Sequence, residues 1–346
     1  KIMGITNREY FLLFLVSFIL VGMLTPLSRR FAISNNVIDR PDSPHKSHLK
    51  SVPYLGGVAI IIGIVSITYA TSLISDFTQN TFWLATSVLA PATALGIIGL
   101  IDDIRKLSPW PRFIAQSLAA IFTAVLLIVT DNFGNPTGSR IFDVSITILW
   151  IVGICNSINF FDNLDGGAAG TVAVSSIGLA ILSIHSQQYL ITAMSVVTLG
   201  SMLGFLIWNK SPARIYMGDA GALFLGILVG VLTIRLKPQT ETHLGSYATP
   251  ILLLAVPIMD TSVAVISRLK RNLSPFQGGQ DHLSHRLIRI GIDRKIAAMS
   301  LWFISAVFVA LAIAINFIND SEKIILIAGS AVWILLFIFF ISRKDS

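Results

Sequence analysis

The chain has 346 residues, of which 54% are hydrophobic and 12% charged, and its mean hydropathy is +0.77. Soluble domains carry roughly 25% charged residues, so this chain has too few charged side chains to cover a soluble globule. The single cysteine, Cys155, excludes an internal disulfide, and a net charge of +7 in so apolar a chain indicates basic membrane loops rather than a nucleic-acid partner.

Apolar runs long enough to cross a bilayer recur along the whole chain. A spanning helix needs about 20 mostly apolar residues. The sequence therefore predicts an all-α polytopic membrane protein, with one transmembrane domain over residues 1–346. We expect eleven transmembrane helices, near residues 10–28, 54–74, 82–101, 112–130, 144–159, 168–184, 188–208, 220–236, 247–267, 296–317 and 323–341.

Lysine and arginine are unevenly divided between the two sides of such a bundle. Eleven spans place every odd-numbered loop and the C-terminus on one side, which then carries 19 of the 25 basic residues. Because short basic loops stay in the cytoplasm, we expect this side and the C-terminus to be cytoplasmic. The N-terminus is then expected outside.

The unusual polar segments all fall on this same side. Loops on the other side, such as "SDFTQN" and "HSQQ", are short and simple in composition. The polar segments are "HKSHLKSVPYLGG" (45–57), the Asp102–Asp103 pair, "NSINFFDNLDGG" (156–167), "NKSPARIYMGDAG" (209–221) and "SPFQGGQDHLSHRLIRIG" (274–291). We predict one composite site at the cytoplasmic membrane face, formed by loops at about 29–53, 102–112, 156–167, 209–220 and 268–295.

The residue types in these segments suit phosphate chemistry. Carboxylates beside hydrocarbon are costly and point to function. Five of them offer hard oxygen ligands that suit Mg²⁺ or Mn²⁺ better than zinc: Asp102, Asp103, Asp162, Asp165 and Asp219. Groups that could bind phosphate accompany them: Lys46, His48, Lys106, Arg112, His282, His285 and Arg286. This set favours transfer of a phosphorylated group from a soluble donor to a membrane-held acceptor, with an acidic residue as base or as nucleophile.

Each motif also has a structural interpretation. Asp102 and Asp103 could cap the following helix or pair with Arg105 and Lys106. The basic residues at 268–271 are typical of cytoplasmic loops, and we interpret them so. It is less plausible that all five segments fall on one side by accident.

The segment 156–167 has a regular spacing. Asn156, Asn159, Asp162 and Asp165 recur every three residues, which on a helix brings side chains near one face. The spacing predicts a shared polar surface.

Taken in order, five motifs between about residues 39 and 291 resemble those of the polyprenyl-phosphate N-acetylhexosamine-1-phosphate transferases (glycosyltransferase 4 type). The nearest resemblance is to the bacterial UDP-GlcNAc:undecaprenyl-phosphate branch. The motifs are "HKSHLKSVPYLGG", "GLIDDIRKLSPWPRF", "NSINFFDNLDGGAAG", "NKSPARIYMGDAGALFLG" and "SPFQGGQDHLSHRLIRIG".

This resemblance implies a reaction and a set of roles. A polyprenyl phosphate would attack UDP-HexNAc, with Mg²⁺, to give polyprenyl-diphosphate-HexNAc and UMP at the bacterial plasma membrane. It implies Asp219 and Asn159 as metal ligands and Asp102 as the residue that activates the lipid phosphate. The implied catalytic residues are Asp102, Asp103, Asp165, His282, His285 and Arg286. The implied substrate-binding residues are Lys46, His48, Lys106, Arg112, Asn156, Asp162, Asn209 and Tyr216. No nucleic-acid partner is expected, and a homodimer is left open.

The chain departs from the family pattern at three positions. Ser284 stands where the family has its central histidine, Asn163 where many members have glycine, and Gly167 where leucine is usual. These departures bear on the identity of the sugar more than on the reaction.

Three alternatives stay open. One is phospho-N-acetylmuramoyl-pentapeptide transferase activity. Another is a secondary transporter of an anionic solute, for which Asp260 is the one deeper acidic residue in the sequence. The third is an inactive relative kept as an assembly partner, and a large gain of turnover in Ser284→His would indicate such a degraded site.

Overall fold

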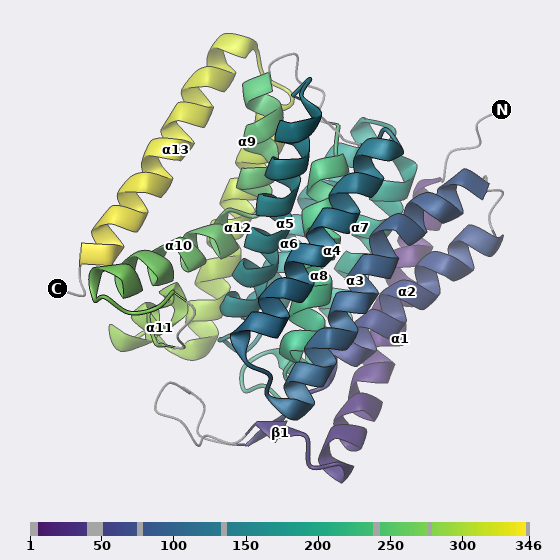
Figure 1. Cartoon of the computed structure of the whole chain (residues 1–346), viewed down its shortest axis with the longest axis vertical. Helices are drawn as coiled ribbons and strands as arrows, with labels where there is room; N and C mark the ends of the chain where they lie inside the picture. Colours follow the sequence, from purple (N-terminus) through teal and green to yellow (C-terminus); the bar gives the residue numbers. More distant parts are fainter. Residues whose placement is uncertain are drawn as a thin grey trace.

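Thirteen helices and one two-residue β-ladder make up the part of the chain that the structure, a computed structural model, describes (Figure 1). It describes residues 6–39, 51–74, 79–132, 137–237, 243–275 and 279–343. The elements are α1 (Asn7–Ser34), β1 (Ile38–Asp39), β2 (Val52–Pro53), α2 (Gly56–Ile74), α3 (Gln79–Arg105), α4 (Pro109–Val129), α5 (Arg140–Phe161), α6 (Gly167–His185), α7 (Tyr189–Asn209), α8 (Gly218–Arg235), α9 (His243–Leu253), α10 (Ala255–Lys270), α11 (Leu283–Arg289), α12 (Arg294–Ile315) and α13 (Asp320–Arg343). The prediction of an all-α fold is confirmed.

Ten of these helices are long and apolar enough to cross a membrane, and the count is eleven if α9 and α10, which pass the same test together across a sharp bend, form one span. This agrees with the predicted eleven. The boundaries differ at the polar ends: α3 continues through Arg105 and α5 through Phe161. Asp102, Asp103, Asn156 and Asn159 therefore lie on helices, where we expected loops.

The ninth predicted span, 247–267, is two helices that meet at 77°. Pro257 has no N–H to donate to the carbonyl of Leu253, four residues earlier, so that carbonyl loses its helical partner. The hydroxyl of Ser175 on α6 donates to it at 2.7 Å. A freed carbonyl at membrane depth needs such a partner, which explains how the bend is tolerated there.

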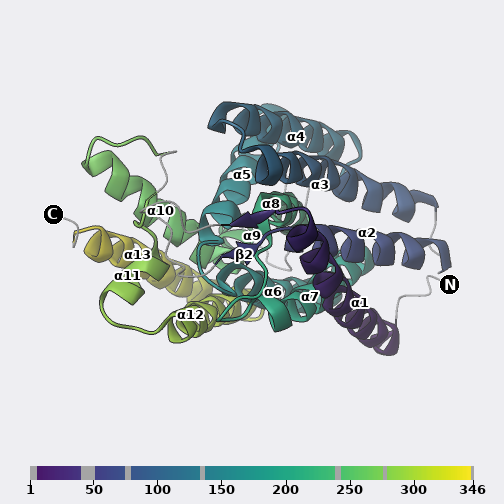
Figure 2. The same ribbon diagram turned by 90° about the horizontal axis from the view of Figure 1, so that it is seen from below.

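The central helix of the bundle is α8. Nearly all of its side chains are buried, whereas the outer helices α1 and α13 bury few. Viewed from below, α8 lies among α2, α3 and α5 (Figure 2), and it contacts all three. The site residues at the start of α8 are thus held by several helices at once.

Small residues let α1 and α7 approach closely. A Cβ added at Gly204 would lie 2.3 Å from the carbonyl oxygen of Phe18, and one at Gly200 would lie 2.1 Å from Ser17 Oγ. Glycines four apart on a membrane helix commonly allow such contact between backbones. This packing fixes α1 against the bundle.

We expect Gly204→Ala to lower the melting temperature of the purified protein in detergent, at a cost of about 2 kcal/mol, because α1 must move away from α7. The control is Gly329→Ala on α13, where an added Cβ meets nothing within 4 Å among the described residues. Equal melting temperatures for the two variants would show that the α1–α7 contact is not tight.

Candidate active site

The N-terminus of α8 is capped by a side chain from another helix. Asp103, in the last turn of α3, accepts the backbone N–H groups of Asp219 at 2.9 Å and Ala220 at 3.1 Å. Met217, at the N-cap position, has no side-chain oxygen for this role. Asp103 therefore acts as a cap, as one alternative proposed, but on α8 rather than on the helix that follows it in the chain.

Two glycines, one on α2 and one on α3, allow the backbones of these helices to approach α8 closely. A Cβ at Gly99 would lie 2.4 Å from the carbonyl oxygen of Asp219, and a Cβ at Gly57 would lie 2.2 Å from the backbone nitrogen of Gly221. Both glycines belong to the predicted motifs. They place the start of α8 directly against the Asp102–Asp103 turn.

A single guanidinium nitrogen joins two of the predicted carboxylates. Arg112 Nη1, at the start of α4, lies 3.0 Å from Asp102 Oδ2 and 2.8 Å from Asp219 Oδ2. Asn159 Nδ2 donates to the other oxygen of Asp219 at 2.5 Å, and the N–H of Leu107 donates to Asp102 Oδ1 at 2.6 Å. Residues from α3, α4, α5 and α8 thus converge on one point, as the sequence predicted.

Asp162 adds another carboxylate to this cluster. Burial raises its pKa well above the usual range, and the neighbouring carboxylates of Asp219, Asp103 and Asp165 raise it further. A buried group of like charges favours protons or cations. We call Asp102, Asp103, Asp162, Asp219 and Arg112 the acidic cluster.

Asp165, Asn209 and Tyr216 hold the two loops beside the acidic cluster together. Asp165 accepts the N–H of Ala213 at 3.0 Å and the hydroxyl of Tyr216 at 3.3 Å. Asn209 accepts the N–H of Gly166 at 3.1 Å and donates to the carbonyl of Ile215 at 3.0 Å. These contacts join the α5–α6 connection to the α7–α8 connection.

Tyr216 stays protonated in this setting. Burial and the adjacent carboxylate of Asp165 raise its pKa, so its hydroxyl remains a donor. Its ring lies beside that of Tyr54, with centroids 6.5 Å apart. The predicted stacking of Tyr216 on uracil stays a prediction.

Asn156 points away from the acidic cluster. Its amide donates to Gln116 on α4 at 2.8 Å, and it lines a largely apolar cavity of about 420 Å³ between α5 and α10. The three-residue spacing therefore does not give one shared surface, because Asn159 reaches Asp219 while Asp162 and Asp165 lie beyond the end of α5.

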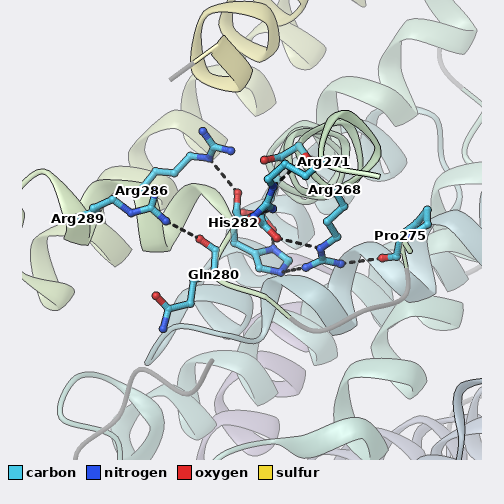
Figure 3. Close-up of polar contacts among 10 residues, drawn as sticks. Arg268, Arg271, Pro275, Gln280, His282, Arg286 and Arg289 are labelled. Atoms are coloured by element: carbon cyan, nitrogen blue, oxygen red, sulfur yellow. Dashed lines mark hydrogen bonds and ion pairs between the residues drawn. The ribbon is translucent and has the colours of Figure 1, made fainter. Parts of the chain in front are cut away.

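A second polar cluster surrounds Arg268, whose side chain is 2% exposed (Figure 3). Arg268 Nε lies 3.1 Å from Asp281 Oδ2, Nη1 donates to the carbonyl of Pro275 at 2.8 Å, and Nη2 lies 3.2 Å from His282 Nε2. The guanidinium also lies 5.6 Å from the centre of the Phe160 ring. Our interpretation of residues 268–271 as ordinary loop cations is therefore wrong for Arg268, because long-range partners bury it.

The ring of His282 has a defined tautomer. Asp260, which is fully buried, accepts from His282 Nδ1 at 2.7 Å and from the N–H of Leu283 at 2.7 Å. Because the guanidinium of Arg268 can only donate, Nε2 of His282 accepts and Nδ1 carries the proton. Both ring nitrogens are thus occupied. We name Asp260, Arg268, Asp281 and His282 the histidine clamp.

His285 has a different environment. Within the described part of the chain its Nδ1 has no hydrogen-bond partner, and the side chain is buried. Burial lowers its pKa to about 4, and the positive charges of Arg294 and Arg289 lower it further, against the opposing effect of Asp260. His285 is therefore neutral near pH 7.

This pKa predicts a loss of stability in mild acid. Between pH 6.5 and pH 4 the unfolded chain binds a proton at His285 that the folded protein does not bind, so the free energy of unfolding falls as the pH falls. We expect the melting temperature to drop less between pH 7 and pH 5 in His285→Gln than in the parent protein. An equal drop in both proteins would contradict a lowered pKa at His285.

The remaining predicted residues are more scattered. Arg286 donates to the carbonyls of Asp281 at 2.9 Å and Ile341 at 2.6 Å, beside the end of α13. Lys106 is exposed at the end of α3. Lys46 and His48 lie outside the described residues.

The prediction of site residues missed Arg268 and Asp281, and treated Asp260 as a hint of a transporter. The available signals were weak: Asp281 precedes His282 directly, and Asp260 follows a proline in an apolar run. Asp260 is now accounted for by the histidine clamp.

The carboxylate and amide oxygens of the acidic cluster and Asn159 are ligand types that suit a divalent ion such as Mg²⁺. Asp102 and Asp219 already share one cationic group, and Mg²⁺ usually takes one or two carboxylates together with water and substrate phosphate. The described residues contain no cage of three or more Asp, Glu, His or Cys side chains set around one point.

Comparison with known proteins matches residues 85–237 to the model of "Glycosyl transferase family 4". The chain is 32% identical to a probable undecaprenyl-phosphate N-acetylglucosaminyl 1-phosphate transferase of Bacillus subtilis, over 95% of this chain and 87% of that protein. It is 28% identical to a decaprenyl-phosphate N-acetylglucosaminephosphotransferase of Mycolicibacterium smegmatis, over 95% and 87%. It is also 29% identical to a phospho-N-acetylmuramoyl-pentapeptide-transferase of Geobacillus kaustophilus, over 88% and 95%.

Proposed function

The chain belongs to glycosyl transferase family 4, and from this premise we propose that it transfers HexNAc-1-phosphate, specifically GlcNAc-1-phosphate, from a UDP-sugar to a polyprenyl phosphate, with release of UMP. The observation that carries the proposal is the Asp102–Arg112–Asp219 bridge at one end of a multi-pass membrane bundle. The names of the full-length relatives from Bacillus and Mycolicibacterium support GlcNAc as the sugar.

In this proposal the acidic cluster binds the reacting phosphates. Asp219 and Asn159 would hold Mg²⁺ or Mn²⁺, which when bound neutralises diphosphate charge. Asp102 would activate the lipid phosphate, Arg112 would bind it, and Asp103 keeps Asp219 in place. The apolar cavity between α5 and α10 would take the first part of the lipid chain.

The donor would lie between the acidic cluster and α11. In this arrangement one side of the space would be formed by the two joined loops, with Asp162, Asp165, Asn209 and Tyr216. His285 would face it as the neutral imidazole, whereas His282 would orient α11. The end of the bundle that carries both clusters would face the cytoplasm, where UDP-sugars are made.

Purified protein with a polyprenyl phosphate and Mg²⁺ should release UMP from UDP-GlcNAc, and release should cease without lipid or with a chelator. The donor screen should include UDP-GalNAc and UDP-MurNAc-pentapeptide, because one relative is named for the pentapeptide substrate. Turnover with the pentapeptide donor alone would move the assignment to that activity. No UMP from any of the three donors would contradict the proposed function.

A further inference from the structure

One side of α11 is fixed by the histidine clamp. Asp260 on α10 binds both the ring of His282 and the N–H of Leu283, each at 2.7 Å. Arg268 adds its contacts to Asp281 and His282. The first turn of α11 is therefore held rigidly against α10.

The next residue of α11 reaches the opposite way. Ser284, which is 0% exposed, donates its hydroxyl to Asn163 Oδ1 in the α5–α6 connection. Asn163 in turn donates its amide to the carbonyl of Phe160 at 2.6 Å, at the end of α5. Both polar groups of the Asn163 side chain are used, so this one carboxamide ties α11 to the end of α5.

The two partners of this bond each adjoin a residue of the proposed donor site. Asp162, a member of the acidic cluster, precedes Asn163, and His285 follows Ser284. We propose that Asn163 and Ser284 form one positioning pair that sets the spacing between Asp162 and His285, and thereby the selectivity for the donor sugar. This inference rests on the proposed function.

The contact between Ser284 and Asn163 leaves little room for a larger side chain at position 284. Since Ser284 is fully buried against Asn163, a histidine ring at 284 would have to occupy the space of the Asn163 carboxamide. A glycine at 163 would provide that space.

The test is a double-mutant cycle on the full-length protein: parent, Ser284→His, Asn163→Gly, and the two combined. We expect Ser284→His to lower kcat/KM for UDP-GlcNAc at least about tenfold, because it overpacks a closed space. The combined variant should return to within about threefold of the parent, since contacting residues couple strongly. Asn272→Gly, on an exposed loop with φ of 55°, is the control for an asparagine-to-glycine change and should keep full activity.

Donor selectivity separates positioning from simple support of the fold. Ser284→Ala removes the hydroxyl alone, and we expect it to change the ratio of kcat/KM for UDP-GlcNAc over UDP-GalNAc at least about threefold. An unchanged ratio with a lowered melting temperature would assign the pair a structural role and overturn the proposal.

Two other results would also overturn it: effects of Ser284→His and Asn163→Gly that simply multiply in the combined variant, or a gain of turnover in Ser284→His alone. If the parent protein turned over none of the donors, the proposed function would fail on its own. The melting temperatures of the same four proteins would then decide whether the two residues act as a pair. Shifts in melting temperature that simply add in the combined variant would reject the pairing.

Discussion

Asp102→Asn should lower the turnover of UDP-GlcNAc about a thousandfold, within the range that a positioned acid or base contributes to an enzyme. Asparagine keeps the shape of the side chain and can still accept from Leu107. It loses the charge that pairs with Arg112 and any capacity to take a proton from the acceptor. Because the proposed donor contacts lie on other loops, the Kd for the UDP-sugar should change less than about threefold.

The matched control is Asp143→Asn. Asp143 is also a buried aspartate, but it lies at the start of α5 and accepts from Thr137, at the opposite end of the bundle. It should keep full turnover. Steady-state UMP release and equilibrium binding of UDP-GlcNAc measure the two quantities separately. If Asp102→Asn lost donor binding but kept turnover at saturating donor, Asp102 would belong to the donor site instead.

Asp103 should behave differently from its neighbour. Its carboxylate caps α8 and so acts through Asp219. We expected both adjacent aspartates to be catalytic, with Asp102 activating the lipid phosphate. Their difference depends on a contact between residues 116 positions apart, and no local pattern contains that information.

Much of the fold could be predicted because hydrophobic length is a direct consequence of bilayer thickness. Ten of the eleven predicted spans are single helices and the remaining one is the bent α9–α10 pair; the convergence of Asp102, Asn159 and Asp219 was also predicted, since loop parity puts their segments at one end. The 77° bend was not predicted, because Pro250 and Pro257 lie in a run that is apolar enough to be interpreted as one straight span.

The direction of individual side chains was the least predictable feature. Asn156 and Asn159 lie on one helix, yet one reaches Gln116 and the other Asp219. Arg268 looked like an ordinary loop cation because nothing adjacent in the sequence shows the ring of Phe160 or the carbonyl of Pro275. Burial of a charge is a property of the folded neighbours, so it becomes visible once these segments are placed in space.

Arg268→Met should be the most destabilising single change in the histidine clamp. Methionine fills much of the space but leaves Asp281 and Nε2 of His282 without the donor that now serves both. Removing one partner of a buried ion pair costs about 3–5 kcal/mol, and the melting temperature should fall by at least about 5 °C. UMP release should fall with it, since α11 would no longer be held against α10.

Arg271→Met provides a matched comparison, because Arg271 pairs with the same Asp281 from a position that is 42% exposed. An exposed pair contributes about 0–1 kcal/mol, so this variant should melt within about 2 °C of the parent. Arg268→Lys should fall between the two: it keeps the charge but cannot reach Asp281, Pro275 and His282 together with one ammonium group. If Arg268→Met and Arg271→Met melted alike, burial would not be what gives Arg268 its importance, and the position of α11 would have to depend on Asp260 and the Asn163–Ser284 pair alone.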